Sequence, residues 1–322
     1  MIYNTNGIPT EDPIDGKYWL KQLEYTYILK ENDITCEIEA ECQKLYDLIS
    51  VKLFGNIETY YSKLSTIPRW VKEAGLDAEF RISKLEFEQL ISQNNDNQEY
   101  CKLLYFYDFR NLIASIQNSI IESNYLFGEF YKQLNENDFL ITKMSINENG
   151  IQYASGLIVT NIFSTLNHLF VCFYSLFDFT TKLFFEFENM VTEFSTYPRL
   201  KSLNKTYGDH KRLSSFDKTD TIFEQSETLN TIITVRNEIV HNSSIDNLPK
   251  VYQFFNNGKL TEKYILLPDF ENGKLLTFNN RKHFFNNNTK INEILPEMIK
   301  EFWTRMKTTL ETLTKANGEQ KP

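Results

Sequence analysis

The residues best suited to chemistry are Arg236, Asn237 and His241, in the segment 226–244. An imidazole has an unperturbed pKa of about 6.5, which suits general acid-base catalysis near neutral pH. An arginine presents a planar, multi-donor fork that matches a phosphate group. On a helix, Asn237 and His241 would be neighbours at i and i+4, so that the amide can orient the imidazole. The three residue types therefore indicate chemistry on a phosphate ester.

A helix must position these three side chains. Drawn at about 100° per residue with Leu229 at zero, it gathers the apolar residues within about 80°, namely Ile222, Ile232, Ile233, Ile239 and Val240. Arg236 falls at about −20°, in the middle of this stripe, where a charged side chain is costly unless it is paired or lines an interface. A snorkelling side chain, or a cation complementing the helix dipole, would explain a residue at the rim better.

Arg236 and His241 are five residues apart, or about 140° around an ideal helix. They can serve one site in only three ways. The helix ends at His241, Arg236 reaches round the helix, or two chains supply the residues jointly.

The sequence Arg236-Asn237-Glu238-Ile239-Val240-His241 resembles the signature of the HEPN superfamily, the higher eukaryotes and prokaryotes nucleotide-binding domain. That signature has an Arg, commonly a polar residue next, and a His a few residues later. It lies late in a helix that follows a long apolar one, as it does here. The resemblance covers roughly residues 151–322, and residues 1–148 carry no recognisable match.

The resemblance implies an all-α bundle that dimerises along the motif helices and cleaves RNA without a metal or another cofactor. It assigns general acid-base catalysis at the ribose 2′-hydroxyl or the leaving oxygen to His241, and binding of the scissile phosphate to Arg236. Asn237 would support these two residues or contact the phosphate. Family members paired with a nucleotidyltransferase antitoxin often carry Tyr two residues after the His. Here that position is Ser243, which speaks against that subclass.

The charge of the chain is unevenly distributed. The net charge is −9, which weighs against a protein held on nucleic acid by charge alone, since that mode needs a cationic surface. Residues 195–218 nevertheless hold six basic residues against two acidic ones, with Tyr197, Tyr207 and His210 among them. This loop is either a solvated surface segment or an RNA-binding track that contacts the backbone and stacks on bases; its candidate RNA-binding residues are Arg199, Lys201, Lys205, Lys211 and Arg212.

The composition predicts a mainly α protein. Only 11 Gly and 8 Pro accompany 15% aromatic residues, which favours long helices over many short strands. The hydrophobic periodicity predicts a strand-like entry at 18–29 and helices at 33–64 with a break near Gly55, 99–134, 152–194, 219–241 and 291–316. A small antiparallel β meander is expected at about 251–278, with turns at Asn257-Gly258 and Asn272-Gly273. We place a domain boundary at 148/149, between an N-terminal, mostly helical region of unknown role and a HEPN-like domain.

The uncharged stretch 157–177 is long enough to cross a bilayer. Because it carries several polar residues, including Asn161, Asn167 and His168, we expect a core helix instead. His168 is accordingly expected to be a satisfied core residue. The first thirty residues lack a secretory signal, so the expected location is cytoplasmic. Cys36, Cys42, Cys101 and Cys172 are scattered and are expected to be free thiols, with no metal site.

Together these observations predict a cytoplasmic, homodimeric, HEPN-like endoribonuclease. The alternative is a non-catalytic HEPN-like module that binds a nucleotide or a partner protein, which the acidic charge favours. A membrane-associated protein is a third possibility. The resemblance suggests a toxin or host-defence setting with a possible antitoxin or regulatory partner, and the Phe, Tyr, Asn and Lys bias suggests an AT-rich bacterial genome.

Overall fold

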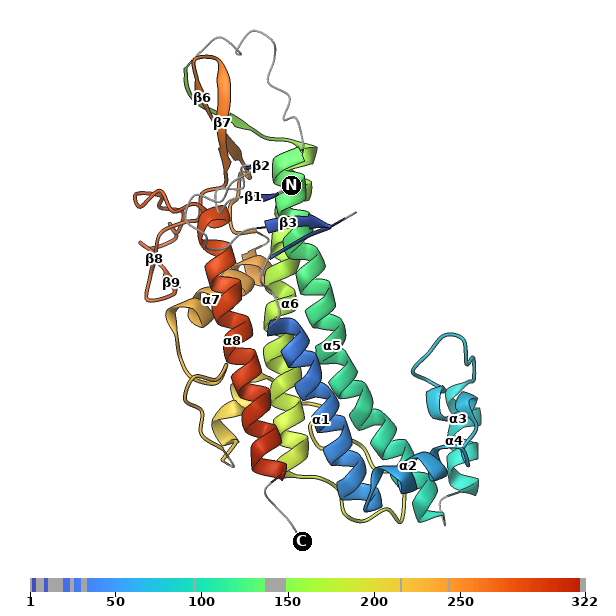
Figure 1. Cartoon of the computed structure of the whole chain (residues 1–322). Helices are drawn as coiled ribbons and strands as arrows, with labels where there is room; N and C mark the ends of the chain where they lie inside the picture. Colours follow the sequence, from blue (N-terminus) through green and yellow to red (C-terminus); the bar gives the residue numbers. More distant parts are fainter. Residues whose placement is uncertain are drawn as a thin grey trace. The chain divides into compact units, whose positions relative to one another are not determined.

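The computed structural model describes residues 2–3, 9–10, 20–23, 26–29, 34–94, 97–136, 149–214, 216–242 and 244–318. Within these ranges the protein is mainly α, as predicted (Figure 1). The helices are α1 (Ile34–Phe54), α2 (Ile57–Leu64), α3 (Arg69–Glu73), α4 (Lys84–Gln93), α5 (Gln98–Glu136), α6 (Leu157–Glu188), the 3₁₀ helix η1 (Tyr207–Arg212), α7 (Glu227–Asn242) and α8 (Ile291–Gly318). The strands are β1 (Ile2–Tyr3), β2 (Pro9–Thr10), β3 (Leu20–Leu23), β4 (Thr26–Leu29), β5 (Gly150–Ala154), β6 (Val251–Asn256), β7 (Lys259–Tyr264), β8 (Phe270–Glu271) and β9 (Lys274–Leu275).

Most predicted helices are present. The break near Gly55 separates α1 from α2. Gly55 has a φ of 85°, in the left-handed region that glycine adopts more readily than other residues. The predicted helices at 99–134 and 291–316 correspond to α5 and α8, and the strand-like entry contains the antiparallel pair β3 and β4.

The chain forms two compact units, each built from three separate stretches. Unit 1 comprises Met1–Glu37, Ser119–Leu176 and Lys218–Thr308, and unit 2 comprises Ile38–Asn118, Phe177–Asp217 and Thr309–Pro322. Each unit therefore draws on both sides of the boundary predicted at 148/149. Residue 148 itself lies outside the described residues.

A three-stranded antiparallel sheet in unit 1 corrects one sequence prediction. Its order is β5-β6-β7, and the β6–β7 turn has positive φ at Asn257 (52°) and Gly258 (73°), as a tight hairpin turn requires. The strand that the sequence did not predict is β5, whose residues 152–154 were predicted as the start of a helix. Gly156, with a φ of 110°, separates β5 from α6. The predicted strand near Leu275 instead pairs with β8 in a separate hairpin.

Helix α6 is the one helix in the described ranges that is long and apolar enough to cross a membrane by length and composition. In unit 1 it packs as a core helix. The ring of its buried Phe173 lies 4.7 Å from that of Phe302 and 5.8 Å from that of Trp303, both on α8. Its Thr165 hydroxyl donates to the side-chain oxygen of Gln133 on α5 at 3.1 Å.

A buried carboxylate organises unit 2. Glu186, at the end of α6, is fully buried. It accepts hydrogen bonds from the Tyr105 hydroxyl (2.6 Å) and the Ser202 backbone N–H (2.8 Å), while the Val191 N–H donates to the same tyrosine oxygen (3.3 Å). Burial and the neighbouring carboxylate hold the pKa of Tyr105 well above its ordinary range. The network thus joins α5, α6 and the loop that follows α6.

Candidate functional site

The motif helix α7 begins at Glu227, later than the predicted start at Thr219 or Asp220. Asp220 has a φ of 57°, which no helix can continue. Ile222 therefore lies outside α7 and does not share its stripe. The buried residues of the helix are Leu229, Thr231, Ile232 and Val235.

This buried face is rotated away from the predicted stripe. On a helix at about 100° per residue, its four members centre near −85° with Leu229 at zero. Ile233 and Arg236 are half-buried and Val240 is 51% exposed. Arg236, at about −20°, therefore lies near one edge of the buried face and not in its middle. Because it is only half-buried, its desolvation cost is smaller than the sequence suggested.

The hairpin β8–β9 covers another side of α7 at Gly273. The Thr234 hydroxyl donates to the Gly273 carbonyl oxygen at 2.7 Å. A Cβ at Gly273 would lie 2.4 Å from the Asn230 Cβ and 2.5 Å from the Glu227 carbonyl oxygen, and the residue has a φ of 74°. Only glycine allows this close approach.

Gly273→Ala is therefore expected to lower the free energy of unfolding by about 2 kcal/mol or more, because strain and a backbone clash add. Gly55→Ala is the matched control, since Gly55 also has a left-handed φ (85°) but a Cβ there would meet nothing within 4 Å. Chemical denaturation of both variants measures the difference. Equal losses in the two variants would contradict the close packing of the hairpin on α7.

The Arg236 side chain is held by two neighbours. Its guanidinium carbon lies 4.1 Å from the ring centroid of Tyr174 on α6, and its Nη1 donates to the Asn237 side-chain oxygen at 3.0 Å. Among the residues that the structure describes, no acidic side chain forms an ion pair with it. The adjacent Glu238 instead pairs with Lys282. A guanidinium oriented in this way can bind an anion from solution.

His241 is exposed and has no hydrogen-bond partner within the described part of the chain. Asn237 is bonded to Arg236 and not to His241, contrary to the predicted orienting role. Because α7 continues to Asn242, ideal helix geometry keeps Arg236 and His241 about 140° apart. One chain thus supplies two diverging side chains. Ser243 lies outside the described residues.

Residues 195–217 of the predicted RNA-binding loop belong to unit 2, whereas Lys218 and α7 belong to unit 1. Lys205 is half-buried with its Nζ 4.3 Å from the ring centroid of Phe185, and the exposed Arg212 pairs with Asp209 at 3.3 Å. The remaining candidate cations are exposed, namely Arg199, Lys201 and Lys211.

The aromatic rings of this loop serve internal packing, which speaks against the base-stacking role that the sequence suggested. The ring of Tyr207 stacks on Phe177 (4.7 Å between centroids) and on His210 (4.6 Å). The Tyr197 hydroxyl donates to the Asp108 carboxylate at 2.5 Å. The loop therefore presents exposed cations to solvent, whereas Tyr197, Tyr207 and His210 are engaged within the protein and do not offer free rings for bases.

The Asp108–Tyr197 pair predicts a pH dependence. Burial raises the pKa of Asp108 from 3.8 to about 6, although the Tyr197 hydrogen bond opposes the rise. The folded state therefore binds the proton more tightly than the unfolded state, and this contribution to stability is complete below pH 3.8 and is lost as the pH rises through about 6. Asp108→Asn keeps an acceptor for Tyr197 and cannot ionise. We expect this variant to be more stable than the parent at pH 7 by up to about 3 kcal/mol, and the difference to shrink to below about 1 kcal/mol at pH 4.

Urea denaturation across this pH range measures the difference, with the exposed Asp77→Asn as control. A difference between Asp108→Asn and the parent that does not change with pH would contradict the assignment.

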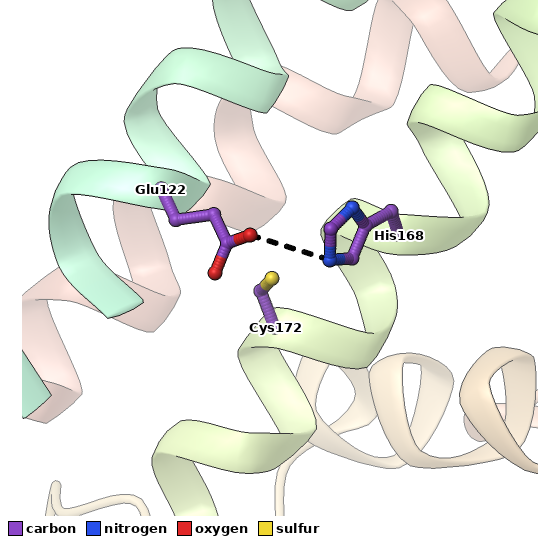
Figure 2. A group of neighbouring side chains, drawn as sticks. All are labelled: Glu122, His168 and Cys172. Carbon is purple, nitrogen blue, oxygen red and sulfur yellow. Dashed lines mark ion pairs between the residues drawn. The ribbon is translucent and has the colours of Figure 1, made fainter. Parts of the chain in front are cut away.

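A third group of candidate side chains was not predicted from the sequence. His168 was predicted to be a core residue, but it is exposed. It lies with Glu122 and Cys172 in a cluster on α5 and α6 (Figure 2). Burial, and then the nearby Glu122, raise the pKa of the Cys172 thiol to about 12. The spacing of His168 and Cys172 at i and i+4 was a readable sign of the cluster, since such residues share a helix face.

The chain was compared with models of protein families, with curated proteins and with solved structures, and none of the three comparisons finds a match.

Proposed function

We propose that this protein is a HEPN-like, metal-independent endoribonuclease in which Arg236 and His241 act on RNA. One observation carries the proposal. The Arg236 guanidinium is half-exposed, oriented by Tyr174 and Asn237, and in the described residues it has no carboxylate partner. The site therefore offers a positioned fork for a phosphate, with an accessible imidazole five residues further along the same helix.

In the proposed reaction, the 2′-hydroxyl oxygen attacks the adjacent phosphorus while the bond to the 5′-oxygen breaks. The products are a 2′,3′-cyclic phosphate and a free 5′-hydroxyl. His241 moves the proton, either from the attacking hydroxyl as a base or to the leaving oxygen as an acid. Arg236 binds the phosphate and the charge that develops on it.

The proposed active form is a homodimer. Because Arg236 and His241 diverge on one continuous helix, a joint site needs Arg236 from one chain and His241 from the other. The face formed by Ile233, Arg236 and Val240 supports this arrangement, since it is apolar around one cation and incompletely buried. Two such faces related by a twofold axis can pack on each other.

The exposed cations of residues 195–218 would bind the RNA backbone by charge. We also propose a cytoplasmic location and a toxin or host-defence role in a bacterium, with an antitoxin or regulatory protein as a possible partner. These settings come from the family resemblance alone.

Light scattering and a cleavage assay test the proposal. At micromolar concentration we expect a mass of two chains, and Val240→Asp should shift it toward one chain while the exposed Leu248→Asp, outside α7, should not. RNA incubated with the protein in excess chelator should yield 2′,3′-cyclic phosphate ends. A single-chain mass for the parent would contradict the joint site.

The non-catalytic alternative is favoured by the divergence of the two side chains within one chain. A calorimetric titration with nucleotides separates it from the nuclease. Nucleotide binding that requires Arg236, without any RNA cleavage, would replace the nuclease proposal by a binding module.

A further inference from the structure

Three different metal-binding side chains meet between two neighbouring helices of unit 1. Glu122 comes from α5, and His168 and Cys172 come from successive turns of α6. Figure 2 shows the three side chains directed toward one another, with the Cys172 sulfur between the two helices. One ligand atom from each residue lies within 4.8 Å of the other two, and His168 Nε2 is 3.4 Å from Glu122 Oε1.

These separations fit a single small cation. With zinc–nitrogen and zinc–oxygen bonds of about 2.0–2.2 Å and tetrahedral angles, two such ligand atoms are about 3.4 Å apart. A zinc–sulfur bond of about 2.3 Å places the sulfur about 3.6 Å from the nitrogen. The His168–Glu122 distance already has the tetrahedral value, so small side-chain rotations bring in the sulfur.

We propose that Glu122, His168 and Cys172 form a zinc-binding site that joins α5 to α6. Two ligands at i and i+4 on one helix face reach a common ion, as paired histidines do in helical zinc sites. The sulfur, nitrogen and oxygen donor set suits zinc better than magnesium or calcium, which prefer oxygen ligands alone.

The burial of the three residues gives the site an inner and an outer side. Cys172 is 5% exposed, whereas the side chains of His168 and Glu122 are 52% and 50% exposed. An ion can therefore enter from solvent and bind first to the outer pair. Three protein ligands leave the fourth position of a tetrahedral zinc to water.

The contact between His168 and Glu122 is a weak link between the helices without a metal ion. An ion pair between two half-exposed side chains contributes at most about 1 kcal/mol. A cation shared by three ligands would link the helices much more strongly, because binding to the folded state alone stabilises it. The site is on other helices than Arg236 and His241, so the ion is expected to support the fold and not to take part directly in the proposed RNA chemistry.

Cobalt titration of the full chain tests the site. After removal of bound metal, we expect one equivalent of Co²⁺ to bind and to produce a thiolate-to-cobalt charge-transfer band. Cys172→Ala should abolish the band, and His168→Gln and Glu122→Gln should each weaken binding at least tenfold. Cys36→Ala and His283→Gln are matched controls and should bind as the parent does. No stoichiometric binding by the parent, or equal binding by Cys172→Ala, would overturn the proposal.

Zinc competition and thermal unfolding provide a second readout. Zinc should displace the cobalt and raise the melting temperature of the parent by several degrees, but not that of a Cys172→Ala protein that still unfolds cooperatively. An equal rise in both proteins would place the ion elsewhere and overturn the proposal. If the parent binds zinc as expected but does not cleave RNA, the nuclease proposal fails while the zinc site stands. The two failures are therefore distinguishable.

Discussion

His241→Ala is expected to reduce RNA cleavage by roughly 10²- to 10⁴-fold, the range that general acid-base catalysis contributes. The substitution removes the only imidazole of α7, and the exposed position of His241 means that the fold should not change. Initial cleavage rates on a defined RNA, measured with matched melting temperatures, give the result. His283→Ala, which changes a histidine on the segment between β9 and α8, should cut as the parent does.

A mixing experiment extends this prediction to the joint site. Arg236→Ala should be as inactive as His241→Ala, because the phosphate loses its cation. When the two inactive proteins are mixed and exchange subunits, about half of the dimers are hybrids, and each hybrid retains one site with both residues intact. About a quarter of the parent's activity should return. A mixture that stays inactive despite measured subunit exchange would contradict the assignment of Arg236 and His241 to different chains.

Glu186→Ala is expected to lower the free energy of unfolding by roughly 3–5 kcal/mol. The Tyr105 hydroxyl and the Ser202 N–H both donate to this carboxylate. Removing it leaves two buried donors without an acceptor, at about 1–3 kcal/mol each, and creates a cavity in unit 2. Urea denaturation monitored by circular dichroism measures the loss.

Two further variants test the cause of this loss. Glu193→Ala removes an exposed acid a short distance along the same loop and should change stability by less than about 0.5 kcal/mol. Tyr105→Phe keeps the ring but removes both the hydrogen bond to Glu186 and the one from the Val191 N–H. Its effect should not add fully to that of Glu186→Ala, since the two side chains share the first of these bonds. Full additivity would show that the hydrogen bond between Tyr105 and Glu186 does not contribute to the loss.

The fold class was predictable because it depends on composition and on local periodicity. The scarcity of glycine and proline predicted long helices, and α5, α6 and α8 confirm this. β5 was missed because its residues directly precede an apolar helix, and only pairing with β6, about a hundred residues away, makes it a strand. Register with a distant partner is not encoded locally.

The environment of the candidate site was less predictable than its residues. The helical wheel placed Arg236 in a buried stripe, but the hairpin β8–β9, α6 and α8 decide which side of α7 is covered. In the same way, His168 and Cys172 carried a readable spacing, whereas Glu122 becomes their neighbour only through the packing of α5 on α6.

The assembly of each unit from three stretches has a consequence for synthesis on the ribosome. Unit 1 combines residues near the start of the chain with residues up to Thr308, and its Tyr131 hydroxyl bonds to the Asn292 carbonyl 161 positions away. At about 5–20 residues per second, tens of seconds separate the first stretch from the last. During that time the apolar side chains that later contact α8, such as Phe173, lack their partners. Neither unit can therefore complete its folding during synthesis before its last stretch, which ends at Thr308 in unit 1 and at Pro322 in unit 2, has been made.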